Sequence, residues 1–222
     1  MNTLLLVGTP AAGKTTFASI VKYGKAPDKY IETDVDEIRK GRLIKKTILD
    51  TGGLERNDEL KYRKWIDESK KICFFFDGIK FLNEIENFYE GGEISSKISF
   101  YVLKPKIEKG YDGKEEGTKK PFDTTKLFFI ATHDDEFVTF KQNYIKEHGA
   151  KKFEEVFGNS NDMRSAIIAR LKSANREYAK LCGTNRYAFS TLFGGVHFLC
   201  INTTDKRQTL EAYKQIIDFR FK

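Results

Sequence analysis

Short continuous apolar runs alternate along this chain with segments whose apolar residues recur every three or four positions. The continuous runs have the length of single strands and end at glycine or polar residues, which is typical of strands buried on both faces. Four of them predict buried strands, over Thr3–Val7, Ile72–Phe76, Leu127–Ala131 and Val196–Ile201. Tyr30–Arg39 and Leu43–Leu49 predict two further strands, paired around a turn at Lys40-Gly41.

Segments with helical spacing lie between the runs. The apolar residues of the predicted helices are Phe17, Ile20 and Val21; Phe81, Ile85 and Phe88; Met163, Ile167, Leu171, Ala174, Tyr178 and Leu181; and Leu210, Tyr213, Ile217 and Phe221. The third helix spans Asp162–Cys182, and Asp205 is the predicted N-cap of the fourth. This alternation predicts an α/β fold with a mostly parallel central sheet flanked by helices. A chain of 222 residues fits one such domain.

Composition places the chain among globular proteins, with 40% hydrophobic and 32% charged residues. Its net charge of +7 comes without runs of basic residues interleaved with aromatics. We therefore expect a lysine-rich solvated surface and no nucleic-acid partner. Cys73, Cys182 and Cys200 are widely spaced in apolar contexts. They predict buried thiols in a reducing compartment, not a disulfide or zinc framework.

The sequence carries no recognisable targeting or anchoring signal. The apolar run near its start is too short for a signal peptide, and no apolar stretch approaches the length of about 18 residues that a membrane span needs. The last residues include no prenylation cysteine. We expect a cytoplasmic protein with no membrane span and no lipid anchor.

The most specific motif follows the first predicted strand and precedes the first predicted helix. Its sequence, Gly8-Thr9-Pro10-Ala11-Ala12-Gly13-Lys14-Thr15, matches G-x-x-x-x-G-K-[ST]. In this context backbone N–H groups form an anion nest, Lys14 reaches the β- and γ-phosphates, and the Thr15 hydroxyl ligates Mg²⁺. The candidate phosphate contacts are Gly8, Thr9, Pro10, Ala11, Ala12, Gly13, Lys14, Thr15 and Thr16. ATPases, kinases and GTPases share this motif, so it fixes neither the base nor the reaction.

A second motif, Asp50-Thr51-Gly52-Gly53, follows an apolar strand and precedes a polar stretch. An acid at a strand end can hold a Mg²⁺-bound water, and a glycine can present its N–H to a γ-phosphate at close range. Asp50 is therefore a candidate metal-site residue, and Gly53 is a candidate γ-phosphate sensor. The distance from Lys14, 50 − 14 = 36 residues, leaves room for one helix and two strands.

This motif, together with Trp65 and the strand Ile72–Asp77, resembles the switch II region of Arf-like GTPases and of the Gα and signal-recognition-particle receptor β-subunit branches. The resemblance implies a P-loop G domain that binds GTP or GDP with Mg²⁺ and hydrolyses GTP. It also implies protein effectors or regulators at the switch regions, residues 30–39 and 54–65. Two segments, near 93–126 and 137–190, are longer than a minimal member needs and are interpreted as insertions and candidate partner surfaces.

The resemblance places base recognition where guanine-binding proteins carry N-K-x-D, and this chain has Thr132-His133-Asp134-Asp135 there. A carboxylate at this point accepts hydrogen bonds from guanine N1–H and the 2-amino group, a pattern that adenine does not offer. Asp135 fits the register, with Asp134 as second choice. Thr132 stands where the family has Asn, and the His133 ring replaces the Lys stem along the base.

The loop Asn202-Thr203-Thr204, after the last predicted strand, occupies the place of the segment whose backbone N–H reads guanine O6. Helix capping explains this loop nearly as well. A switch I threonine that ligates Mg²⁺ is also implied, and Thr33 suits it, 33 − 14 = 19 residues after Lys14.

The water-orienting Gln that follows D-x-x-G in Arf- and Ras-like proteins is replaced here by Leu54. A leucine side chain cannot hydrogen-bond water, so we expect slow intrinsic hydrolysis. Glu55 is a weak substitute. Arg56 is either a cis arginine or a surface ion-pair residue.

Two other functions remain open. Thr33–Arg39 resembles the acidic D-x-[DE]-x-[IL]-R stretch of some phosphotransferases and zeta-toxin-like kinases, in which Asp34 or Asp36 would accept a proton from a substrate hydroxyl. The other alternative is a GTP-binding scaffold without turnover, which Leu54 favours.

Overall fold

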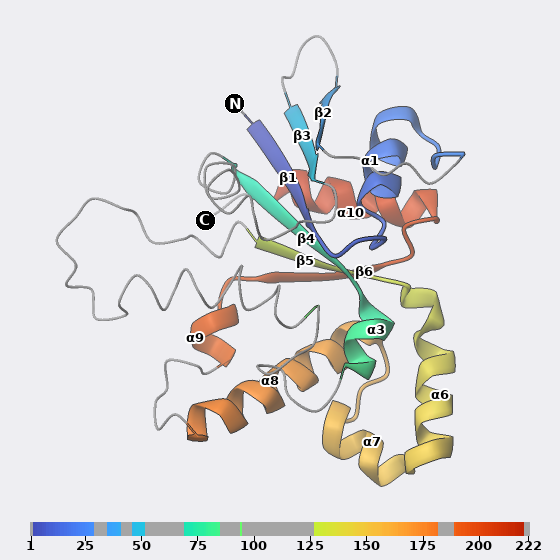
Figure 1. Ribbon diagram of the computed structural model, residues 1–222, viewed down its shortest axis with the longest axis vertical. Helices are drawn as coiled ribbons and strands as arrows, with labels where there is room; N and C mark the ends of the chain where they lie inside the picture. Colours follow the sequence, from blue (N-terminus) through green and yellow to red (C-terminus); the bar gives the residue numbers. More distant parts are fainter. Residues whose placement is uncertain are drawn as a thin grey trace, which may run out of the picture. The chain divides into compact units, whose positions relative to one another are not determined.

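The computed structural model describes residues 2–28, 35–40, 46–51, 69–84, 94, 127–181 and 189–219 (Figure 1). The chain divides into two compact units. The sheet unit comprises Met1–Asp77, Lys126–Asp135 and His197–Lys222, and the helical unit comprises Gly78–Thr125 and Glu136–Val196. The segments interpreted above as insertions lie almost entirely in the helical unit.

The sheet unit is built on a six-stranded sheet in the order β2-β3-β1-β4-β5-β6. Its strands are β1 (Asn2–Gly8), β2 (Val35–Lys40), β3 (Lys46–Thr51), β4 (Lys71–Asp77), β5 (Leu127–Thr132) and β6 (His197–Ile201). The pairings of β3 with β1, β1 with β4, β4 with β5 and β5 with β6 are parallel, whereas β2 runs antiparallel to β3. The α/β class with a mostly parallel sheet is therefore confirmed, as is the pairing of the two strands that precede the second motif.

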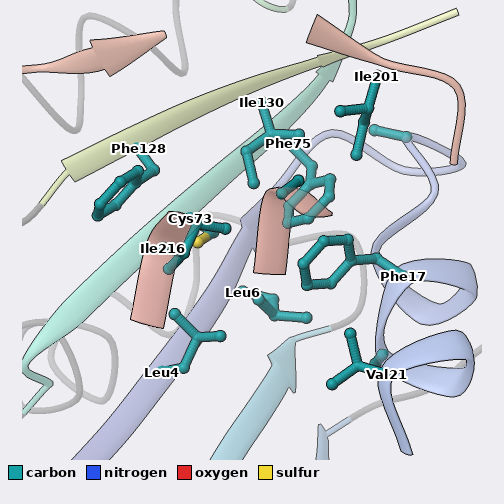
Figure 2. Packing of buried hydrophobic residues seen from close by; sticks show 13 residues of the cluster. Leu4, Leu6, Phe17, Val21, Cys73, Phe75, Phe128, Ile130, Ile201 and Ile216 are labelled. Carbon is teal, nitrogen blue, oxygen red and sulfur yellow. The ribbon is translucent and has the colours of Figure 1, made fainter. Parts of the chain in front are cut away.

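One face of this sheet packs against α1 (Lys14–Tyr23) and α10 (Lys206–Asp218). Alternate residues of β1, β4 and β5 reach this face, as the two-residue period of a strand requires. The buried cluster, shown in Figure 2, consists of Leu4, Leu6, Ala12, Phe17, Ala18, Val21, Cys73, Phe75, Phe128, Ile130, Ile201, Ala212 and Ile216. The ring of Phe17 on α1 meets the ring of Phe75 on β4 edge to face, with centroids 5.2 Å apart. Helix α1 is thus fixed directly to a central strand.

The central strands are buried on their second face as well. The ring centroid of Phe129 on β5 lies 5.4 Å from that of Phe74 on β4 and 5.4 Å from that of Phe198 on β6. All three phenylalanines are buried. Burial on both faces explains why β4 and β5 read as continuous apolar runs instead of alternating ones.

Side chains form hydrogen bonds with the free backbone N–H groups at the start of α10 and with the free backbone carbonyls at its end. Asp205 accepts hydrogen bonds from two first-turn backbone N–H groups at 2.8 and 3.1 Å, which confirms it as the N-cap. At the other end the Lys71 ammonium donates to the backbone carbonyls of Ile216, Ile217 and Phe219. A cation beside the last carbonyls of a helix complements the negative end of its dipole.

The buried face of α10 differs from the predicted one. Its buried residues are Thr209, Ala212 and Ile216. Of the residues predicted to form the face, Tyr213 packs against the core, but Leu210 is exposed. Thr209 and Ala212 are small, and the buried Thr209 hydroxyl donates a hydrogen bond to the Thr203 carbonyl, so the buried face includes positions that a search for large apolar residues does not select.

The helical unit contains α3 (Gly78–Asn83), α6 (Phe137–His148), α7 (Ala150–Phe157), α8 (Met163–Leu181) and α9 (Phe189–Phe193). Helix α8 confirms the helix predicted over Asp162–Cys182. Helices α6 and α7 were not predicted. They pack against each other through four aromatic rings, those of Phe140, Tyr144, Phe153 and Phe157. Within the described part of the chain, no helix is both long enough and apolar enough to cross a membrane.

Helix α3 corresponds to the start of the helix predicted around Phe81, which is buried, and it ends at Asn83. Ile85 and Phe88, the other residues of that prediction, lie outside the described residues. The Glu84 carboxylate follows the helix and accepts hydrogen bonds from the backbone N–H of Ile94, at 3.2 Å to either oxygen. This contact ties the end of α3 to a segment ten positions further along the chain.

The cysteines follow the prediction only in part. Cys73 is fully buried, and this burial raises the pKa of its thiol, an effect that the charge of Lys71 opposes. Cys200 is only half-buried, so the expectation of a buried thiol was wrong there because β6 is the last strand of the sheet. Cys182 lies outside the described residues.

Replacing Phe75 by alanine should lower the free energy of unfolding by about 3–5 kcal/mol, because the fully buried ring would leave a cavity between β4 and α1. The matched control is Tyr23→Ala, since Tyr23 is 64% exposed and its loss should change stability by less than about 0.5 kcal/mol. Urea denaturation followed by circular dichroism measures both variants. Equal losses for the two would contradict the described core.

Candidate functional site

The loop between β1 and α1 has an unusual backbone that brings it close to β4. Gly8, Ala11 and Gly13 have φ angles of 135°, 57° and 79°, in the region that favours glycine. A Cβ on Gly8 would lie 1.9 Å from the Phe75 carbonyl oxygen, so only glycine fits there. The backbone N–H of Thr9 donates to the same oxygen at 3.0 Å. The loop is therefore fixed at its first residues by the neighbouring strand.

The Lys14 side chain is buried with its ammonium against this loop. Its Nζ donates to the carbonyl oxygens of Thr9 at 2.7 Å and of Gly8 at 3.4 Å. A buried cation requires polar partners, and here the loop's own backbone supplies two of them. An anionic oxygen would be a stronger acceptor for the same ammonium, because the attraction between opposite charges adds to the hydrogen bond.

The first turn of α1 has a second feature that suits an anion. Gly13 is the N-cap residue and provides no side-chain hydrogen bond, and the first turn contains no acidic residue. The positive end of the helix dipole is therefore not offset by a capping side chain or a carboxylate. A helix start of this kind, next to a buried lysine, suits a bound phosphate. Thr15 and Thr16 lie in this turn and are partly exposed.

The loop after β6 meets the first loop. A Cβ on Gly13 would lie 2.6 Å from Thr203 Oγ1, so the Thr203 side chain packs directly against the Gly13 backbone. Thr203 is buried, and its carbonyl accepts a hydrogen bond from Thr209 Oγ1 at 3.2 Å. The Asn202 side chain accepts from the backbone N–H of Thr204 at 2.9 Å. The structure thus brings the predicted residues 202–204 together with the phosphate-loop motif.

The ends of β4 and β5 form the third part of this edge. Thr132 is buried, and its hydroxyl donates to the Phe76 carbonyl at 3.2 Å, so that hydroxyl links two strands. His133 has φ of 66°, and its Nε2 lies 3.9 Å from Asp77 Oδ2. Asp135 is exposed in the short 3-10 helix that follows.

Sequence reasoning assigned no role to Asp77, the partner of His133. The signal that could have found it is its position: a carboxylate directly after the apolar run Ile72–Phe76, paired in register with Thr132 on β5. Because the carboxyl ends of parallel strands meet at one edge of a sheet, polar residues after such runs gather there.

Strand β3 carries the second motif toward the same edge. Asp50 lies within β3, not after it, and pairs with Leu6 on β1 and with Asp36 on β2. Since Gly8 is two residues beyond Leu6, the end of β3 at Thr51 lies close to the level at which the phosphate-loop motif begins. Gly53, Thr33, Asp34 and Leu54 lie outside the described residues, as do most of the proposed switch regions, and of β2 and β3 only the backbone is described.

Mg²⁺ would bind at this edge mainly through the oxygens of a bound phosphate and not through a set of protein side chains alone. Within the described residues no group of three or more His, Cys, Asp or Glu side chains is placed to hold a metal ion. Mg²⁺ in P-loop proteins usually keeps several waters and binds phosphate oxygens with one or two protein groups. Thr15, in the first turn of α1, is the described residue that fits this role.

Comparison with known protein families and with curated proteins gives no match for this chain. The interpretation of the site therefore depends on its motif, its position between a strand and a helix, and its geometry. Together these describe a loop suited to an anion, at the carboxyl edge of a mostly parallel sheet.

Gly13→Ala should destabilise the protein more than Gly24→Ala does. Both glycines cap α1 with left-handed backbones of similar φ, 79° and 74°, which costs an alanine about 1–2 kcal/mol. Only at Gly13 would the added Cβ also overlap Thr203, because the nearest atom to a Cβ at Gly24 is 3.5 Å away. Urea denaturation of the two variants measures the difference.

The additional variant Thr203→Ala identifies the source of this difference. Combined with Gly13→Ala it should recover part of the loss, with a coupling of about 0.5–3 kcal/mol. Combined with Gly24→Ala it should be additive. Additivity in both combinations would rule out the contact between the two loops.

Proposed function

We propose that this chain is a small-GTPase-like nucleotide-binding protein that binds GTP or GDP with Mg²⁺ and hydrolyses GTP slowly. The observation that carries the proposal is the phosphate-loop motif with a buried Lys14 at an uncapped helix start. Backbone N–H groups, the helix dipole and the ammonium all favour the same ligand, a polyphosphate.

The strand arrangement supports a GTPase over other P-loop classes. Strand β2 runs antiparallel to β3, and β3 leads into Asp50-Thr51-Gly52-Gly53 beside β1. A resemblance to Arf-like GTPases implies such a hairpin between the P-loop helix and switch II. In that function Gly53 and Thr33 would bind the γ-phosphate and Mg²⁺, and release of the phosphate would free both loops.

Base recognition is assigned to the loop that follows β5. Asp135 is exposed just beyond the carboxyl edge of the sheet, in the sheet unit that also holds the P-loop motif. Its carboxylate would accept hydrogen bonds from guanine N1–H and the 2-amino group. The left-handed backbone at His133 and the nearby Asp77 carboxylate would orient the imidazole ring, which takes the place of the lysine stem beside the base.

A phosphotransferase is the second candidate, and one backbone observation favours it. Asp36 on β2 pairs directly with Asp50 on β3, one strand away from the phosphate-loop strand. Two carboxylates at opposed positions destabilise a sheet unless something offsets their charge, and a metal ion or substrate would do so. In this function Asp36, or Asp34 beside it in sequence, would accept the proton of a substrate hydroxyl as that oxygen attacks the γ-phosphate.

Nucleotide titration distinguishes the two candidates. With fluorescent GDP, GTP and ATP analogues in Mg²⁺, we expect guanine nucleotides to bind more tightly than ATP. Loss of a charge-assisted hydrogen bond pair should weaken GDP binding by about 100-fold in Asp135→Ala. The matched control is Asp218→Ala, which removes an exposed carboxylate from α10 and should leave affinity unchanged. Preference for ATP, or indifference to Asp135→Ala, would exclude the GTPase and favour the phosphotransferase.

Hydrolysis tests the role of Leu54. Single-turnover GTP hydrolysis should proceed at about 10⁻³ s⁻¹ or slower, because no side chain at this position orients the attacking water. Leu54→Gln should raise the rate by about tenfold without changing GTP affinity. Faster hydrolysis in the unmodified protein would show that another residue, such as Glu55, supplies the missing function. No measurable hydrolysis in either protein would favour a GTP-binding scaffold.

A further inference from the structure

The helical unit contains a cleft lined by residues of α3 and α6 and by Glu136, which precedes α6, and none of these residues belongs to the candidate phosphate site. The two helices can be followed in Figure 1. Its volume is about 550 Å³, within the range of about 300–1,000 Å³ that small-molecule sites occupy. The lining residues are Ile79, Asn83, Glu136, Thr139, Phe140, Asn143, Tyr144, Glu147 and His148. Every one of these described lining residues belongs to the helical unit.

One face of α6 supplies most of the cleft. Thr139, Asn143 and Glu147 follow one another at intervals of four, so they lie along one side of the helix. The aromatic residues of the cleft are in mutual contact: the Tyr144 ring centroid lies 5.9 Å from that of Phe140 and 4.5 Å from that of His148. The cleft therefore combines a row of polar groups with an aromatic wall.

The charge of the cleft is opposite to that of the chain. The chain carries a net charge of +7, yet the described lining residues include two carboxylates, Glu136 and Glu147, and neither lysine nor arginine. The His148 Nε2 lies 3.8 Å from Glu147 Oε1. Burial raises the pKa of Tyr144, an effect that the charge of Arg170 opposes, but Arg170 is not among the described residues that line the cleft.

We propose that this cleft binds an organic cation, a guanidinium or alkylammonium group carried on a short apolar chain. The aromatic wall would attract the cation through its ring faces, and the glutamates would accept its hydrogen bonds. Asn83, Thr139 and Asn143 would serve the remaining donors or a polar part of the ligand. This binding is independent of the proposed nucleotide function, because it uses none of the same residues.

The test is a calorimetric titration of the full-length chain with butylguanidinium, set against butylurea as the neutral analogue of similar shape. We expect butylguanidinium to bind at least fivefold more tightly than butylurea. The double variant Glu136→Gln/Glu147→Gln should bind butylguanidinium at least fivefold more weakly. Both glutamates are exposed, so the fold should survive these substitutions.

The matched control is Glu154→Gln/Glu155→Gln, which removes the same charge from exposed positions on α7 outside the cleft. This variant should bind butylguanidinium as the unmodified chain does. Equal binding of butylurea, equal weakening by both double variants, or no binding of butylguanidinium would each overturn the proposal.

A second titration identifies where the cation comes from. A short peptide with one central arginine and blocked ends is compared with agmatine, which is decarboxylated arginine and carries the same guanidinium as a free small molecule. At least tenfold tighter binding of the peptide would support a basic side chain of a protein partner as the ligand. Tighter or equal binding of agmatine would support a free small molecule. Absence of binding by both would overturn the proposal.

Discussion

The contact between Gly8 and the backbone of Phe75 determines where the candidate site can form. The Phe75 carbonyl accepts a hydrogen bond from Thr9 and leaves no room for a side chain at position 8. The Phe75 ring meanwhile packs against Phe17 on α1. One residue of β4 therefore positions the beginning of the loop through its backbone, and the helix after the loop through its side chain. The residues concerned are 75 − 8 = 67 positions apart, so the loop acquires its shape only when β1 and β4 pair in the observed register.

Local sequence was sufficient to predict the parts of the fold with strong periodicity or specific end signals. The buried strands, helix α8 and the Asp205 cap are of this kind. The face of α10 was not predictable in this way, because Thr209 and Ala212 are buried although neither is a large apolar residue. Which residues of a helix are buried also depends on the shape of the surface against which the helix packs, and the sequence of the helix alone does not specify that surface.

The candidate site, like the fold, was predictable from local sequence only in part. The motif around Lys14 could be identified from sequence because strand, glycines, lysine and helix follow one another directly. The contact of Thr203 with Gly13 and the pairing of His133 with Asp77 join segments that are distant along the chain. These contacts come from the alignment of parallel strand ends at one edge, which the sequence implies only once the strand order is known. The aromatic cluster of α6 and α7 was missed because its periodicity is broken at Gly149.

The two candidate binding sites lie in different units of the chain. The predicted phosphate and base contacts that the structure describes lie in the sheet unit, at the ends of β1, β5 and β6, whereas the acidic cleft lies in the helical unit. Connections in α/β proteins vary far more readily than the sheet that carries them. The helical unit is formed by such connections, after β4 and after β5, so it is where new specificity can be added without disturbing the sheet.

Because Cys73 is buried in the sheet unit, the reactivity of its thiol measures how often that unit opens. A thiol reacts through its thiolate, and burial in the core of the sheet unit disfavours that form. Alkylation at this position therefore requires the sheet to open, and under weak labelling its rate is proportional to the population of the open state. A ligand that binds only the closed sheet unit would slow this labelling in proportion to its occupancy. Binding of the proposed nucleotide at the phosphate-loop motif would thus be detectable without a fluorophore, by the mass of one peptide.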